Sequence, residues 1–569
     1  MKITKTKIFN YRNLNDVTIE LHNQINFVVG ENNLGKTNIL DLLHIIFNRR
    51  AFKESDFHKL DTPIKIELGI ALDSGEIGLF DDYFTIDEQS NMTQIEIVVL
   101  QESIDDNIEF FIKPTNDDLH RNKIRKAHLI SYGSIRKPEK ELSFAVQNNF
   151  LNLLIRKFLE EHEGGFSLNT DSVSPLIEQI NHQIEKIKTF NLFGIEAEAN
   201  KDISSLLGNI IQLQTKDKFS ISDLGEGTQF INSIPLVLLN QIANIVERDF
   251  SGSIIEVEGK RNLYVIISVD EPELHLHPHT QRFFINYLQE ILSGESKEFN
   301  SLLKIMYDVD AISGQLIAVT HSPFIILDNY KNIVRLFHEQ GQLRALSGVS
   351  IDMDKSLMTH MFRYLDEIKE AFYAKKVLVV EGITEQGAMK ALFEKESINI
   401  NLEGISVVNA HGKDSVPHIV DLFNKFKIPV VGFVDRDENN PEDPKFKDVD
   451  NLFYTDLKEF ENDIVECIDL DGYIEYLKKS EFNVVNSTIA ACKKYNIDCN
   501  PSDPDKYEEQ IRSQSEELKE SVMVELKRNV VHSLTQNKNF INGFLISNYA
   551  NKTPTSIKKA IDYLVSIDG

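Results

Sequence analysis

Residues 30–37 read Gly30-Glu-Asn-Asn-Leu-Gly35-Lys36-Thr37, a glycine-rich loop that ends in a lysine and a hydroxyl residue. The apolar run from Ile25 to Val29 predicts a buried strand before the loop, and the apolar spacing after it predicts a helix. In this context backbone N–H groups surround phosphates, the lysine reaches the terminal phosphates and the hydroxyl binds Mg²⁺. The stretch therefore predicts an α/β nucleotide-binding fold. The expected nucleotide ligands are Gly30, Asn33, Gly35, Lys36, Thr37 and Asn38.

Three further segments carry residues that suit a bound nucleotide. An apolar run ends at the adjacent carboxylates Asp270 and Glu271. We expect Asp270 to hold Mg²⁺ through water and Glu271 to polarise an attacking water. A second apolar run ends near His321, which is placed to sense the γ-phosphate, and Gly225 and Gly227 open a predicted helix where an anion can bind. Taken singly, the last two segments are more often plain turns at a strand end and a helix start.

Composition limits the classes of function. The chain has 569 residues, which suggests about three to four domains. Its formal net charge of −27 excludes binding to nucleic acid by overall charge and disfavours an anionic membrane, but leaves room for a local basic groove. Three cysteines without CxxC spacing and an N-terminus that alternates like a strand favour the reducing cytoplasm. No apolar run approaches about 18 residues, so no membrane span is expected.

A second group of carboxylates follows two predicted strands farther along the chain. Glu381 ends one apolar run, and Glu385 lies one helical turn later. Asp435 and Asp437 end another apolar run. Carboxylates at the same edge of a parallel sheet can converge on Mg²⁺ or Mn²⁺, the ions that phosphodiester chemistry uses. Glu461 is two residues from a second acid in a predicted helix, so only one of the two is expected to face the site.

Other segments leave alternatives open. The helical pattern within residues 145–215 predicts an insertion whose apolar stripe fits either a dimer contact or the head's own core. His275, His277 and His279 alternate as zinc ligands can, but an ordinary turn explains them better. The segment from Asn409 to Asp414 fits a phosphate-contacting loop and a plain turn equally well.

The nucleotide motifs resemble those of an ABC-type ATPase head, the kind found in chromosome-maintenance and DNA-repair ATPases. The resemblance covers residues 30–37, 225–229, 270–278 and 319–323. It also implies that Arg12, in Phe9-Asn-Tyr-Arg-Asn13, lies beside the nucleotide. Residues 225–229 depart from the usual LSGGQ form of the signature motif, so a nucleotide shared between two heads does not follow from them.

The carboxylate pattern resembles a Toprim domain. An ABC-type head followed by Toprim resembles the OLD (overcoming lysogenisation defect) family of nucleases, which includes the nuclease subunit of the Gabija antiphage system. By this resemblance Phe460-Glu461 matches an acidic motif, and Lys552 is the candidate for a late basic residue near the active site. The implied domains are an ATPase over 1–365, with a helical dimerisation insertion over 145–215, and a Toprim nuclease domain over 370–569.

The resemblance implies an ATP-binding DNA endonuclease acting in antiphage defence. Glu381, Asp435, Asp437 and Lys552 would serve the cutting site, and Glu271 would serve ATP hydrolysis. Two metals would bind Glu381, Glu385, Asp435, Asp437 and Glu461, and a third would bind with ATP at Thr37. A homodimer or homotetramer is expected, and a helicase-like partner protein fits some relatives. The alternatives are a DNA-clamping ATPase whose Toprim-like domain does not cut, and a transporter ATPase subunit, which the carboxylates disfavour.

Overall fold

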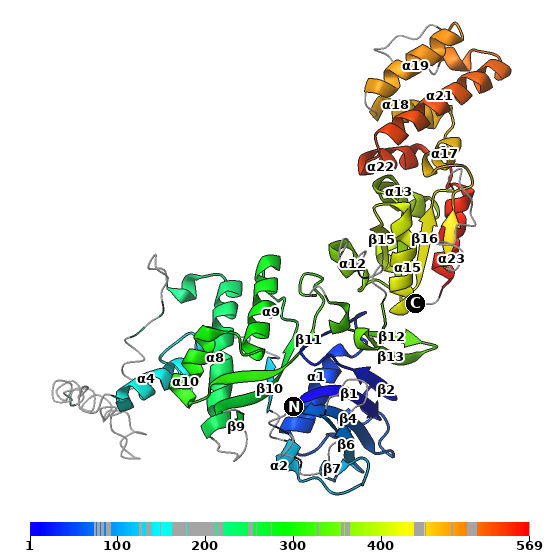
Figure 1. Ribbon diagram of the computed structural model, residues 1–569. Helices are drawn as coiled ribbons and strands as arrows, with labels where there is room; N and C mark the ends of the chain where they lie inside the picture. Colours follow the sequence, from blue (N-terminus) through cyan, green and yellow to red (C-terminus); the bar gives the residue numbers. More distant parts are fainter. Residues whose placement is uncertain are drawn as a thin grey trace, which may run out of the picture. The chain divides into compact units, whose positions relative to one another are not determined.

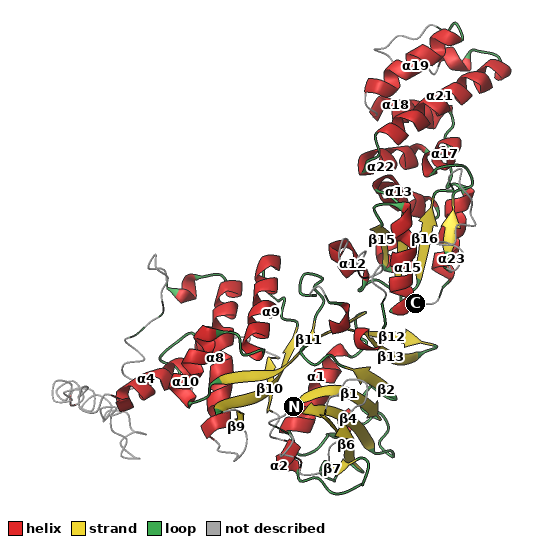
Figure 2. Cartoon of the chain, in the orientation of Figure 1, coloured by secondary structure: helices red, strands yellow, loops and turns green. Residues whose placement is uncertain are grey.

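A computed structural model of the chain is drawn in Figures 1 and 2. It describes residues 1–72, 76, 80, 85–86, 93–124, 128–132, 138–147, 149–161, 178, 211, 213, 220–247, 254–257, 259–274, 276–326, 329–353, 358, 365–436, 449, 451–479, 482–497 and 509–567. The chain divides into two compact units. The first contains Met1–Phe27 and Thr37–Thr320, and the second contains Val28–Lys36 and His321–Gly569.

An antiparallel sheet begins the chain, with the strand order β2-β1-β4-β6-β5 and β7 paired with β6. Its strands are β1 (Lys2–Phe9), β2 (Val17–Glu20), β4 (Ile64–Leu72), β5 (Thr85–Ile86), β6 (Thr93–Gln101) and β7 (Glu109–Ile112). Alternating polar and apolar residues bury one face of β1 and β4, as the sequence predicts.

The segment from Val17 to Val29 is not one continuous strand. The chain turns after β2, where the side chain of Asn26 accepts from the His22 N–H at 2.7 Å and donates to the His22 carbonyl at 2.8 Å. These side-chain bonds replace ladder bonds and redirect the chain into a second sheet.

The second sheet has the order β13-β12-β3-β11-β10-β8, with β9 paired with β10. Its strands are β3 (Ile25–Gly30), β8 (His128–Tyr132), β9 (Ile254–Val257), β10 (Lys260–Asp270), β11 (Ala311–Val319), β12 (Ile333–Glu339) and β13 (Gln342–Ser347). Every residue of β3 is buried, as expected of a central strand, and β10 runs parallel to β8 and β11. Helix α1 (Lys36–Asn48) follows the predicted phosphate loop directly.

The helices of the first unit include α2 (Arg121–Ile124), α3 (Pro138–Glu141), α4 (Phe150–Glu161), α8 (Glu226–Glu247), α9 (Pro278–Leu292) and α10 (Lys297–Tyr307). Among the described residues, α8 alone is long and apolar enough to cross a membrane by length and composition. It buries Leu238, Leu239 and Ile242 and packs against α3, α4 and α10, as a core helix does. Most of the predicted insertion at 145–215 lies outside the described residues; α4 belongs to its described part.

The third sheet is fully parallel, with the order β15-β14-β16-β17. Its strands are β14 (Lys376–Val380), β15 (Ile405–Asn409), β16 (Val430–Val434) and β17 (Leu452–Tyr454). The helices around it are α12 (Leu365–Ala371), α13 (Ile383–Lys395), α14 (Ile400–Glu403), α15 (Val416–Lys425), α17 (Phe460–Glu466) and α23 (Thr555–Ser566). Because β14 and β16 are neighbours and parallel, the residues that follow them meet at one edge.

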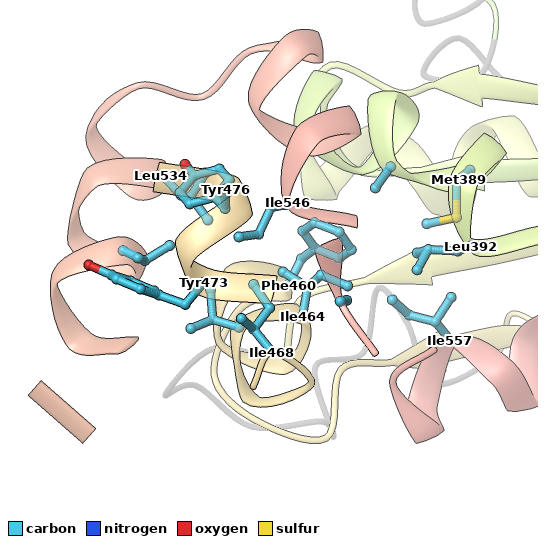
Figure 3. Close-up of a cluster of buried hydrophobic side chains, with 14 of the residues drawn as sticks. Met389, Leu392, Phe460, Ile464, Ile468, Tyr473, Tyr476, Leu534, Ile546 and Ile557 are labelled. Atoms are coloured by element: carbon cyan, nitrogen blue, oxygen red, sulfur yellow. The ribbon is translucent and has the colours of Figure 1, made fainter. Parts of the chain in front are cut away.

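The last helices pack into the core of this domain. They are α18 (Leu470–Lys479), α19 (Phe482–Lys494), α21 (Glu516–Gln536) and α22 (Phe540–Tyr549). Figure 3 shows Tyr473, Leu534 and Ile546 from three of them gathered with Phe460 of α17 and Met389 of α13. The C-terminal helices are therefore part of the hydrophobic core that supports the sheet edge.

Helices α13 and α22 cross at two glycines. A Cβ added at Gly387 would lie 2.1 Å from the carbonyl oxygen of Phe540, and one added at Gly543 would lie 1.9 Å from that of Thr384. No side chain fits at either point, so the two backbones are in direct contact. This contact fixes the start of α22 beside the start of α13.

Candidate functional site

The phosphate loop has the conformation that its motif predicts. Gly30, Asn33 and Gly35 have φ values of 139°, 66° and 83°, and a Cβ at Gly30 would lie 2.4 Å from the Leu336 carbonyl oxygen. The buried Lys36 ammonium donates to the carbonyl oxygens of Gly30 at 2.9 Å and Glu31 at 2.6 Å. The lysine is thus held over the loop where phosphate groups would bind.

The predicted Mg²⁺ ligands of the nucleotide site lie close together. The Thr37 hydroxyl donates to Asp270 Oδ1 at 3.4 Å. Burial, and then the neighbouring Glu271 carboxylate, raise the pKa of Asp270 to about 6. The Glu271 N–H donates to the Val319 carbonyl at 2.9 Å, and its φ of 48° turns the chain sharply after β10. A hydroxyl beside a crowded acid suits a divalent cation.

Arg12 lies against the first turns of α1. Its guanidinium donates to Asn38 Oδ1 and Asp41 Oδ2, each at 2.7 Å, and to Asp56 Oδ1 at 3.0 Å. Hydrogen bonds to Asp41 and Asp56 raise the pKa of Arg12 against the opposing effect of burial. Two carboxylates therefore fix this cation beside the helix that begins at the phosphate loop.

The remaining nucleotide motifs are the segment 225–229 and His321. Gly225 has no atom within 4 Å of its Cβ direction, and Gly227 lies in the first turn of α8. The Gln229 amide donates to the carbonyls of Ser222 and Leu224, which fixes the turn before the helix. The exposed His321 follows β11 and Thr320.

Two members of the histidine run, His277 and His279, are among the described residues. His277 and His279 are exposed, and their rings stack with centroids 5.7 Å apart. His275 lies outside the described residues.

Four carboxylates lie near one another beside the third sheet. Glu381 follows β14 and Asp435 follows β16, and the Asp435 N–H donates to Glu381 Oε2 at 3.2 Å. Asp435 Oδ1 accepts from the Phe460 N–H at 2.7 Å, at the start of α17. Glu385, in the first turn of α13, and Glu461, in the first turn of α17, are both buried. Asp437 lies outside the described residues.

The cluster is short of positive charge. Burial, followed by Glu385, Glu381 and Glu461, raises the pKa of Asp435 to about 8. Burial, with Glu461 and Glu381, raises the pKa of Glu385 to about 7. Both carboxylate oxygens of Glu461 are buried without a hydrogen-bond partner, and the residue is 0% exposed. Buried carboxylate oxygens that accept no hydrogen bond fit a hard cation.

These side chains do not yet form a closed coordination sphere. In the described part of the chain, no group of three or more His, Cys, Asp or Glu side chains is arranged so that it could hold a metal ion. The predicted ligand set also includes Asp437, which lies outside the described residues. The fit to a divalent cation therefore rests on the chemistry of the donors and on the orphaned Glu461 oxygens.

Two lysines border the cluster. Lys538 Nζ lies 3.4 Å from Glu461 Oε1, and Glu461, Glu385 and Asp435 raise its pKa against the effect of burial. Lys413 donates to the Asp435 carbonyl at 2.6 Å, from the segment that the sequence left open as a phosphate loop or a turn.

The basic residue that the resemblance proposes is Lys552. Lys552 lies near Cys467, whose pKa it lowers against the larger effect of burial, and its neighbour Asn551 donates to the Cys467 carbonyl at 2.8 Å. Sequence reasoning missed Lys538. One signal was available, because residues 526–561 contain six Lys or Arg and no Asp or Glu in a chain of net charge −27.

Segments of the nucleotide site contact residues that lead into β14. The Tyr373 hydroxyl donates to the Ser322 carbonyl at 3.2 Å, next to His321. Lys375 Nζ lies 3.9 Å from Glu31 Oε2 of the phosphate loop. All of these residues belong to the second compact unit.

Arg335 of β12 makes a further contact inside this unit. Its guanidinium donates to the carbonyls of Phe426 at 3.2 Å and Lys427 at 2.9 Å, just after α15. Burial lowers the pKa of Arg335 to about 10, against the attraction of Glu31. A buried cation thus satisfies carbonyls at a helix end.

Comparison with known families agrees with this geometry. The model of the AAA ATPase domain matches residues 1–224 and 175–326, which together span more than half of the chain. The chain belongs to this ATPase family. Residues 372–437 match the model described as "Overcoming lysogenization defect protein-like, TOPRIM domain". The Toprim match contains β14, β16 and the predicted ligands Glu381, Glu385, Asp435 and Asp437.

Individual relatives extend over most of the chain. The OLD nuclease of Thermus scotoductus is 23% identical over 76% of this chain and 82% of its own length. Endonuclease GajA of Bacillus cereus strain VD045 is 25% identical over 69% of this chain and 67% of its own length. The Old nuclease of Escherichia phage P2 is 21% identical over 75% of this chain and 76% of its own length. The resemblance to the OLD family and the α/β fold class, an ATPase head followed by Toprim, are therefore confirmed.

Proposed function

We propose that the chain is a divalent-metal-dependent DNA endonuclease that ATP regulates through the ATPase head. The observation that carries the proposal is the meeting of Glu381, Glu385, Asp435 and Glu461 at one sheet edge, with unsatisfied Glu461 oxygens and Lys538 beside them. The names of the relatives, which are nucleases and endonucleases, support this reading over a non-cutting DNA clamp.

The same carboxylates, together with Asp437, would hold two Mg²⁺ or Mn²⁺ ions. When bound, such ions supply Lewis-acid stabilisation of phosphate charge and a water of lowered pKa. The protein's own contribution is to fix the ligands: Asp435 is held through the Phe460 N–H, and Glu381 through the Asp435 N–H. Lys538 adds a positive charge for the phosphodiester, in the role that the sequence assigned to Lys552.

The nucleotide site would bind ATP with one Mg²⁺. Lys36 would move from the loop carbonyls to the phosphates, and Thr37 and Asp270 would hold the ion, directly and through water. Glu271 would orient the attacking water, and Arg12, Gly225, Gly227 and His321 would complete the site. The contacts of Tyr373 with Ser322 and of Lys375 with Glu31 offer a route by which the nucleotide state would reach β14.

Several broader features belong to the same proposal. The ATPase would span residues 1–365, with a dimerisation insertion at 145–215, and the nuclease domain would span 370–569. The protein would act in the cytoplasm in antiphage defence, as a homodimer or homotetramer, with a helicase-like protein as a candidate partner.

The test is plasmid cleavage by the purified chain in Mg²⁺ or Mn²⁺, with and without ATP. Asp435→Ala should abolish cutting and leave ATP binding intact, because the two sites use separate strand ends. Lys36→Ala should abolish ATP binding and serves as the reciprocal control. A variant Asp435→Ala that cuts as fast as the parent would refute the metal assignment. Absence of cutting by the parent under every condition would favour the DNA clamp.

A further inference from the structure

An exposed apolar stripe borders the carboxylate cluster. Phe540, Ile541 and Phe544 of α22 are 48%, 66% and 38% exposed, and Ile383 of α13 is 43% exposed. Positions i, i+1 and i+4 lie on one side of a helix, so the three α22 residues share a face. We call these four residues the α22 stripe. Large apolar side chains on a surface need an explanation when they gather in this way.

The helix crossing places the stripe next to the site. Phe540 follows Lys538 by two residues, and Lys538 contacts Glu461 of the cluster. Gly543 touches the Thr384 backbone, so the residues next to them in sequence, Phe544 and Ile383, lie at the same crossing. Ile383 in turn follows Glu381 by two residues. Two residues of chain span at most about 7 Å, so the backbones of Phe540 and Ile383 lie within that distance of Lys538 and Glu381.

The charge around the stripe suits nucleic acid. Residues 526–561, which include all of α22, have no acidic side chain and six basic ones. The polar residues of the segment 537–548 are the basic Lys538, four asparagines and one serine. The segment itself therefore adds no negative charge that would repel phosphate groups, whereas the chain as a whole is acidic.

We propose that the α22 stripe stacks against unpaired bases next to the scissile phosphate, so that the substrate is DNA that is single-stranded or locally unpaired where it is cut. The inference rests on the proposed nuclease function. Bases in an intact duplex stack on one another and present only their edges, whereas unpaired bases offer flat faces to aromatic rings. Two phenylalanine rings beside a phosphodiester site therefore suit unpaired bases.

A second copy of the chain fits this surface less well. Four partly exposed side chains offer on the order of 300 Å² of contact area. A stable interface requires about 800 Å² from each partner. Asparagines surround the stripe, and they suit hydrogen bonds to bases and phosphates.

The experiment measures binding of the full-length protein to fluorescent single-stranded and blunt duplex oligonucleotides of equal length, in EDTA so that nothing is cut. Phe540→Ala and Phe544→Ala should each weaken single-strand binding at least about fivefold, the equivalent of about 1 kcal/mol of stacking. Duplex binding should change less than twofold. Phe540→Trp should keep the parent affinity, because it keeps an aromatic face. A 2-aminopurine base in the strand should report stacking that Phe540→Ala removes.

Leu402→Ala is the matched control, because Leu402 is 80% exposed on α14 of the same unit. If Phe544→Ala unfolds, Ile541→Ser replaces it, since Ile541 is the most exposed member of the stripe. Equal losses on both DNAs, no loss, or no binding by the parent would overturn the proposal. A lower oligomer mass of the Phe variants in sedimentation would overturn it in favour of a contact between copies. A parent that binds single strands through these rings but never cuts would refute the nuclease function alone.

Discussion

Replacing Gly543 with alanine tests whether the helix crossing holds the cutting site in place. The added Cβ would lie 1.9 Å from the Thr384 carbonyl oxygen, whereas ordinary contact begins at 3.4 Å. Helix α22 must therefore move away from α13 by about 1.5 Å, unless α13 moves instead. Either movement separates Lys538, just before α22, from Glu385 in the first turn of α13.

The stability effect is a balance of two terms. Overpacking of this kind costs about 1–3 kcal/mol. Alanine is favoured over glycine in a helix by about 1 kcal/mol, which offsets part of the cost. We expect the free energy of unfolding to fall by about 0–2 kcal/mol, which lowers the melting temperature by up to roughly 8 °C for a unit of this size. The activity effect is larger, because a shift of about 1 Å in a catalytic group can cost on the order of a hundredfold in rate.

The assay combines thermal melts with metal-dependent plasmid cleavage, measured well below the melting temperature of the variant. Asn548→Ala is the control, since Asn548 lies on the exposed side of the same helix and its substitution requires no backbone movement. Unchanged melting and cleavage in Gly543→Ala would show that the crossing tolerates a side chain. Lower stability with full cleavage would show that α22 does not position Lys538.

Three other predictions follow from the same unit. Lys538→Ala should slow plasmid cleavage at least about tenfold, because Lys538 contacts the carboxylate cluster. Lys552→Ala should change cleavage little, because its described neighbour is Cys467. A larger loss in Lys552→Ala than in Lys538→Ala would favour Lys552 as the basic residue of the active site. Without metal, stability should fall as pH rises from about 4 to 8, because the raised pKa values of Asp435 and Glu385 make the folded state bind more protons than the unfolded one. Melts in EDTA at pH 5.5 and 8 should show this difference, Mg²⁺ should reduce it at pH 8, and an equal difference in Asp435→Asn would contradict the cause. Arg335→Met should lower the free energy of unfolding by about 1.5–3 kcal/mol in a urea titration, because it leaves two carbonyl groups unpaired; a loss below about 0.5 kcal/mol would show that water replaces the guanidinium.

Sequence predicted two kinds of feature in the site. Some are contained in one short segment, and others follow from the order of the strands in a sheet. The phosphate loop needs only residues 30–37 and their flanking strand and helix, so its geometry is contained in one short segment. Glu381 and Asp435 come from distant segments, yet both follow buried apolar runs. Parallel neighbouring strands bring such residues to one edge without further information.

The position of Lys538 depends on contacts that no local pattern contains. Between Glu461 and Lys538 the chain passes through α18, α19 and α21 and returns to the sheet edge only through α22. That return is set by core packing around Tyr473 and Leu534 and by the glycine crossing at Gly543. The resemblance to the OLD family favoured Lys552, which lies near Cys467.

The acid-free segment has a physical reason to be where it is. A cluster of four carboxylates repels a phosphodiester, and bound cations offset this charge most at the scissile phosphate and less along the flanking DNA, because Coulomb interactions weaken with distance. The DNA strand on either side of the scissile bond still carries phosphates, so the protein surface next to the cluster must not add further negative charge. Residues 526–561 meet that requirement, while the chain as a whole keeps its charge of −27. The charge of the segment beside the predicted carboxylates would therefore have directed attention to α22 and Lys538, whereas the net charge of the chain would not.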